Sequence, residues 1–96
     1  MRFRLLFQPT AEAHLAQIKA SDQRKYRKVL KCLGLLEADS RYPGLNSHRY
    51  ENYDDVHGQK IWESYVENRT PGAYRGLWHY GPDDQEITIV AITAHP

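Results

Sequence analysis

The chain has 96 residues, of which 41% are hydrophobic and 26% charged, as in compact globular domains and unlike disordered or fibrous chains. Its one cysteine, Cys32, excludes an internal disulfide and a cysteine-based zinc site. The net charge is only +1, but residues 1–32 carry +6 and residues 33–96 carry −5, which predicts a surface that faces a polyanion or a charged partner. Because we find neither a signal peptide nor an apolar stretch of ~20 residues, we expect a single cytoplasmic domain over 1–96, with no membrane contact.

The first third of the chain predicts a strand and a helical hairpin. Apolar residues alternate through 2–7, as in a half-buried strand. Thr10 is the expected N-cap of a helix over 11–19, and Ser21-Asp22 is expected to begin a second helix. One face of that second helix is basic, with Arg24, Arg27, Lys28 and Lys31, and is read as a solvated surface. We expect the apolar faces of the hairpin to pack on a sheet face with Phe3, Leu5 or Ile89, through Leu15, Ile18, Tyr26, Val29, Leu30 and Leu33.

The remaining two thirds predict a long loop and three strands. Residues 39–59 are rich in turn-forming residues and show no periodicity, which predicts either a functional loop or a poorly ordered one. Strands are expected over 60–67, 73–80 and 86–93, with turns at 68–72 and 81–84. The order β-α-α-β-β-β predicts an α+β fold, in which a helical hairpin covers one face of a mostly antiparallel four-stranded sheet.

Histidines and one arginine are the candidates for chemistry. His48, His57, His79 and His95 follow no metal-ligand spacing, so we expect no metal and no cofactor. Histidine is the commonest general acid or base near neutral pH, although His48 and His57 also fit solvated loop positions. Arg75 lies inside a predicted strand, where burial is costly unless the guanidinium meets an anion, pairs with Glu63 or reaches solvent.

Four short motifs carry a resemblance to a known family: Tyr42-Pro43-Gly44-Leu45, Ile61-Trp62-Glu63, Tyr74-Arg75 and Ile92-Thr93-Ala94-His95. Together with the element order, they resemble the RelE/ParE superfamily of toxins from type II toxin–antitoxin modules. The resemblance implies a cytoplasmic toxin with a cognate antitoxin as partner. RelE-like members are metal-independent mRNA endoribonucleases that act on the ribosome, and this is the function we expect. ParE-like members instead bind DNA gyrase, and a non-toxic binding module of the same fold is a third reading.

The resemblance also implies roles for individual residues. Arg75 looks like the arginine that faces the scissile phosphate, and His95 looks like the C-terminal histidine used as acid or base in the YoeB and HigB branches. Because β-hairpin geometry brings the end of the last strand beside Arg75, we predict that Arg75 and His95 share an accessible pocket on the sheet face away from the helices. Glu63 is expected to orient Arg75 or to act as the base. The expected contacts to RNA are Lys60, His79, Tyr80 and Arg49.

Overall fold

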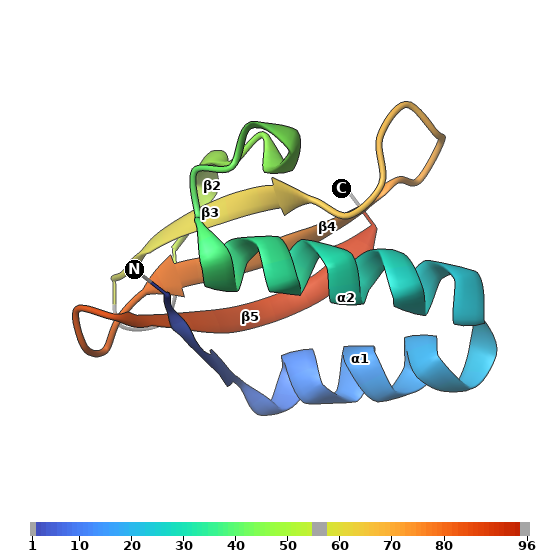
Figure 1. Cartoon of the computed structure of the whole chain (residues 1–96), viewed down its shortest axis with the longest axis horizontal. Helices are drawn as coiled ribbons and strands as arrows, with labels where there is room; N and C mark the ends of the chain where they lie inside the picture. The colour runs from blue at the N-terminus through green and yellow to red at the C-terminus, as the bar shows by residue number, and fades with distance from the viewer. Residues whose placement is uncertain (1, 55–57, 95–96) are drawn as a thin grey trace.

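The computed structural model describes residues 2–54 and 58–94 and shows two helices on one face of a sheet (Figure 1). In chain order the elements are β1 (Arg4–Phe7), α1 (Pro9–Ser21), α2 (Gln23–Ala38), the short 3-10 helix η1 (Pro43–Leu45), β2 (His48–Asp54), β3 (Lys60–Tyr65), β4 (Tyr74–Tyr80) and β5 (Glu86–Ala94). The strand order is β1-β5-β4-β3-β2, with β1 parallel to β5 and all other neighbouring pairs antiparallel. The predicted α+β fold and helical hairpin are confirmed. Within the described residues, no helix combines the length and apolarity needed to cross a membrane.

The start of α2 follows the sequence prediction, whereas the start of α1 does not. The side chain of Asp22 accepts a hydrogen bond from the Lys25 amide at 3.0 Å and so caps α2. Thr10 is not the N-cap of α1, because that helix already begins at Pro9. Proline suits the first helical position, since its φ is fixed near the helical value and its missing N–H is not needed there.

The predicted loop over residues 39–59 contains the main correction to the fold. It holds η1 and a fifth strand, β2, so the sheet has five strands where four were expected. β2 pairs with β3, with His48 opposite Glu63 and Arg49 opposite Trp62. The sequence of β2 shows no alternation of apolar residues. An edge strand does not need it, because backbone hydrogen bonds to its one neighbouring strand can hold it without a continuous buried side-chain face.

The main hydrophobic core lies between the helices and the sheet. On the sheet side it includes Trp78, Ile87, Ile89 and Ile92, with Phe3, Leu5 and Phe7 packed against it, and on the helix side it includes Ile18, Val29, Leu33 and Leu36, joined by partly buried Leu15 and Tyr26. The predicted packing of the hairpin is therefore confirmed for all its residues except Leu30, which is 45% exposed. Leu30 lies one residue, about 100° of helical rotation, from the buried Val29 and so falls outside the contact.

The opposite face of the sheet carries a smaller cluster and the buried polar residues. Ile61, Leu77 and Val90 are buried there. Because side chains alternate along a strand, Glu63 and Arg75 share this face with them. The helix-free face is therefore the place where the sequence predicted chemistry, and its polar residues are described next.

Candidate active site

Arg75 is held in a fixed position on the helix-free face. Its side chain is 10% exposed, and its Cζ lies 3.8 Å from the ring centroid of Tyr65, the cross-strand neighbour on β3. Nη1 donates hydrogen bonds to the main-chain carbonyls of Glu67 and, at 3.2 Å, of Tyr74. Nε is buried and has no hydrogen-bond partner within the described part of the chain, with Glu63 Oε1 4.0 Å away. The guanidinium is thus oriented by backbone and aromatic contacts while one donor is unsatisfied.

Glu63 connects Arg75 to a histidine. Its carboxylate is 1% exposed, and Oε1 lies 2.9 Å from Nε2 of His48. The imidazole of His48 is 45% exposed and donates through Nδ1 to the carbonyl of Asn46 at 2.7 Å. Since a carbonyl and a carboxylate are both acceptors, this arrangement needs a proton on each ring nitrogen, or a proton on Glu63. The contact between His48 Nε2 and Glu63 Oε1 is therefore a hydrogen bond whose proton lies on one of these two atoms.

Three adjacent strands contribute to this group, which we call the His48 cluster: His48 from β2, Glu63 and Tyr65 from β3, and Arg75 from β4. The Tyr65 ring also meets the imidazole edge-on, with ring centroids 6.2 Å apart. The cluster combines a half-exposed group that can exchange protons, a buried carboxylate and a fixed cation. These groups suit a reaction in which a proton moves while negative charge develops.

The structure brings together only part of the predicted catalytic set. Arg75 and Glu63 are neighbours, whereas His95, like His57, lies outside the described residues. The sequence left open whether His48 is an acid–base residue or a solvated loop residue, and it did not place His48 beside Glu63. His48 lies opposite Glu63 only because β2 pairs with β3. A prediction of His48 in the site would have required recognising a strand in a segment with few apolar residues.

The four predicted RNA contacts are not in the His48 cluster. Lys60 is exposed at the start of β3, the opposite end of the strand from Tyr65. His79 shares the helix-free face with the cluster but is 5% exposed and donates through Nδ1 to the Tyr80 carbonyl at 2.9 Å. Tyr80 and Arg49 lie on the helix side of the sheet, as the alternation along β4 and β2 requires.

No metal or thiol chemistry is indicated by the described residues. Within 2–54 and 58–94, no group of three His, Cys, Asp or Glu side chains is arranged to hold a metal ion. Burial raises the pKa of the Cys32 thiol from 9.0 to about 12, so the thiol stays neutral at physiological pH. Cys32 packs in the main core, where its Sγ faces Gly76 of β4.

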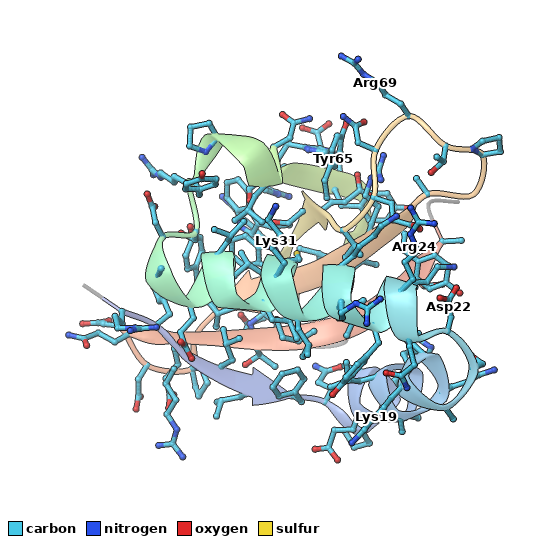
Figure 2. All side chains as sticks on the ribbon, turned by 45° about the vertical axis from the view of Figure 1, so that its right-hand side comes forward. Lys19, Asp22, Arg24, Lys31, Tyr65 and Arg69 are labelled. Carbon is cyan, nitrogen blue, oxygen red and sulfur yellow. The ribbon has the colours of Figure 1, made fainter. Side chains whose placement is uncertain are left out.

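A second feature lies beside the cluster, between α2 and the end of β3. It is a hollow of about 320 Å³ with an apolar floor that includes Leu35, Leu45 and Val66 and a basic rim of Lys28 and Lys31. Lys28 Nζ lies 3.2 Å from Glu67 Oε2 across the hollow. Figure 2 shows Lys31 and Arg24 along α2 and Arg69 projecting from the β3–β4 loop. Tyr65 lines the hollow too and thus connects it to the His48 cluster.

Sequence comparison finds no match, whereas structural comparison finds proteins of similar fold. No protein-family model matches the chain, and no curated protein sequence matches it significantly. A YoeB dimer from Staphylococcus aureus superposes with a TM-score of 0.72 at 14% identity, covering 100% of both chains. A YoeB/ParE toxin from Agrobacterium tumefaciens gives 0.75 at 8% identity, covering 98% of this chain and 100% of that one.

An archaeal RelE, solved as a RelE–RelB complex from Pyrococcus horikoshii, gives a TM-score of 0.68 at 14% identity, with 98% of this chain and 96% of that one covered. All three matches extend over essentially the whole length of both proteins. The resemblance inferred from the sequence motifs is confirmed at the level of the fold: the chain has the fold of the RelE/ParE superfamily of toxins.

Proposed function

We propose that this chain is the toxin of a type II toxin–antitoxin module and acts in the cytoplasm as a metal-independent endoribonuclease on ribosome-bound mRNA. The shared fold supports the toxin role. The observation that carries the nuclease activity is the His48 cluster, in which one oxygen of Glu63 lies 2.9 Å from His48 and 4.0 Å from Arg75. The cluster thus places a proton-transfer group and a cation on either side of one carboxylate.

The chemistry is an intramolecular transesterification of RNA. The 2′-oxygen attacks phosphorus as a base removes its proton, and the bond from phosphorus to the 5′-oxygen breaks as an acid protonates that oxygen. The products are a 2′,3′-cyclic phosphate and a 5′-hydroxyl. His48 supplies a proton when its Nε2–H exchanges the contact with Glu63 for one with the leaving 5′-oxygen, while the Asn46 carbonyl holds the ring through Nδ1. Arg75 counters the charge on the phosphorane. His95 is the proposed partner of His48 in the second proton transfer.

The cleavage assay uses ribosome-bound mRNA and variants of the cluster. Arg75→Ala is expected to lower the rate about 10²–10³-fold, and His48→Gln about 10²–10⁴-fold. Arg2→Ala is the matched control, because Arg2 is exposed and pairs with Glu37 far from the cluster in the sheet order. His95→Gln tests the second histidine in the same assay. Circular dichroism verifies that each variant is folded. Full activity in folded Arg75→Ala and His48→Gln would contradict the proposed mechanism.

A second candidate function is binding without cleavage, as in ParE-like inhibitors of DNA gyrase. It is favoured by the burial of Arg75, whose Nη1 is already used by the carbonyls of Glu67 and Tyr74. Pulse labelling after expression of the chain alone separates the two functions. Rapid loss of protein synthesis identifies the nuclease, loss of DNA synthesis identifies a gyrase inhibitor, and unchanged growth identifies a non-toxic binding module.

The proposed partner is an antitoxin that uses an acidic, amphipathic segment. Proteins of this fold have been solved in toxin–antitoxin complexes, among them YoeB–YefM from Staphylococcus aureus and DinJ–YafQ from Escherichia coli. The basic face of α2, with Arg24, Arg27 and Lys28 exposed, and the apolar floor of the adjoining hollow fit such a segment. Affinity should fall as salt rises, because exposed charge pairs are screened. Salt-independent affinity would place the contact on apolar surface instead.

A further inference from the structure

An aromatic hollow lies on the helix side of the sheet, around the edge from the His48 cluster. It measures about 410 Å³ and is formed where the segment from α2 to β2 crosses the exposed parts of β3 and β4. We call it the Tyr42 hollow; its lining residues are Ser40, Arg41, Tyr42, Pro43, Asn46, Ser47, Trp62 and Tyr80. Three of these residues carry aromatic rings, and Tyr42 and Tyr80 are 46% and 38% exposed. Large, partly exposed rings around one hollow are typical of a binding site.

Two rings of the hollow, those of Trp62 and Tyr80, are held by contacts within the protein. Trp62 stacks on the buried Trp78 with centroids 5.8 Å apart and meets Tyr80 edge-on at 5.9 Å. The Tyr80 hydroxyl shares a hydrogen bond with Ser40 Oγ at 2.9 Å. The ring of Tyr42 lies against Gly44, where an added Cβ would be 3.1 Å from Tyr42 Cε1. Such preorganisation lowers the entropy lost on binding a flat ligand.

The polar groups of the hollow suit a nucleotide. Among the described lining residues the charged one is Arg41, so the hollow is locally basic. Asn46 and Ser47 bring an amide and a hydroxyl that can hydrogen-bond to base edges, while the aromatic rings offer stacking surfaces. Arg49, opposite Trp62 in the β2–β3 ladder, has a buried Nε without a hydrogen-bond partner in the described part of the chain.

Consecutive residues of the backbone connect the hollow to the His48 cluster. Ser47 lines the hollow and is hydrogen-bonded to Ser64 at 2.7 Å, and the next residue, His48, is in the cluster on the other face. The carbonyl of Asn46, another lining residue, accepts the Nδ1 hydrogen bond of His48. The hollow and the cluster therefore lie on the two faces of the sheet at the start of β2.

We propose that the Tyr42 hollow binds an unstacked nucleobase of single-stranded RNA next to the cleaved phosphate. The inference rests on the proposed nuclease function and adds to it a base-binding subsite. It also gives one of the residues predicted as RNA contacts, Tyr80, a place near the substrate despite its separation from Arg75. The aromatic stacking surface, the basic charge and the link to His48 favour RNA over a protein segment as the occupant.

The test measures binding separately from cleavage. The probe is a short single-stranded oligonucleotide with 2′-O-methyl groups throughout, which removes the nucleophile, and binding is followed by quenching of tryptophan fluorescence. Tyr42→Ala is expected to weaken binding roughly 5- to 100-fold, as for loss of one base–aromatic stack. Leu30→Ala, at an equally exposed apolar site on α2 outside the hollow, should bind as tightly as the unchanged chain.

An abasic probe gives the decisive comparison. Removing one base at the correct position should weaken binding to the unchanged chain but not to Tyr42→Ala, because the variant has already lost the stack. If both proteins respond equally at every abasic position, or if Tyr42→Ala binds normally, the hollow is not a base site even where the chain cleaves RNA. A Tyr42→Ala variant impaired only in antitoxin binding would identify a protein contact and overturn the proposal. Absence of cleavage and of probe binding by the unchanged chain would refute the nuclease function itself.

Discussion

Replacing Glu63 by Gln tests the electrostatic reasoning behind the His48 cluster. The change keeps the shape and one oxygen of a side chain that is 1% exposed but removes its charge. At the 4.0 Å that separates Glu63 Oε1 from Arg75 Nε, two unit charges attract by about 4 kcal/mol at an effective dielectric constant of ~20. The cost of desolvating the buried carboxylate opposes this attraction. Removing the carboxylate charge, however, leaves Arg75 buried without a countercharge.

We expect Glu63→Gln to lower the free energy of unfolding by about 2–3 kcal/mol, below the ~3–5 kcal/mol of a fully broken buried pair, because the carbonyl contacts of Arg75 persist. The free energy of unfolding of a domain of this size is about 5–15 kcal/mol. The variant should therefore stay folded, with a melting temperature lower by about 10–20 °C. Urea unfolding followed by fluorescence of Trp62 and Trp78 measures the change at an unchanged m-value.

Glu37→Gln is the matched control. It removes the same charge from an ion pair with Arg2 whose side chains are 41% and 74% exposed, so a loss below ~1 kcal/mol is expected. In a double-mutant cycle, Glu63→Gln and Arg75→Gln should show a coupling of at least ~1 kcal/mol. Equal effects of Glu63→Gln and Glu37→Gln, together with zero coupling to Arg75, would refute the assignment of Glu63 as the countercharge of the site.

Three further predictions concern the fold. Because burial raises the pKa of Cys32 to about 12, its thiol should resist a disulfide reagent at pH 8 until urea unfolds the chain. Above pH 9 the thiol ionises in the unfolded chain but not in the folded one. The free energy of unfolding should therefore fall with rising pH more in the unchanged chain than in Cys32→Ala. Asp22→Ala should cost about 1 kcal/mol through loss of the α2 cap, whereas Thr10→Ala, inside α1, should change stability by less than ~0.5 kcal/mol. Leu36→Ala, at 0% exposure, should cost about 2–5 kcal/mol by urea unfolding, and no loss relative to an exposed leucine would contradict the core assignment.

The sequence by itself determined the elements whose periodicity reflects burial. The apolar stripe of α2 and the alternation of β1 each face one core, so their patterns predict both the element and its buried side. The β-rich run of β5 and the turn at 81–84 likewise predict a hairpin with β4, which is the pairing that forms. Arg75 was recognisable for the same reason: a charged residue inside an apolar strand needs a specific partner.

Tertiary structure alone decided the edge strand and the composition of the site. β2 is stabilised by backbone hydrogen bonds to β3, the next strand along the chain, and such bonds leave little trace in local hydrophobicity. His48 joins Glu63 only through that pairing, and the Tyr42 hollow forms only where the segment after α2 crosses Trp62 and Tyr80. A local sequence pattern records which side of an element is buried, but it does not record which residues of other strands that element will meet.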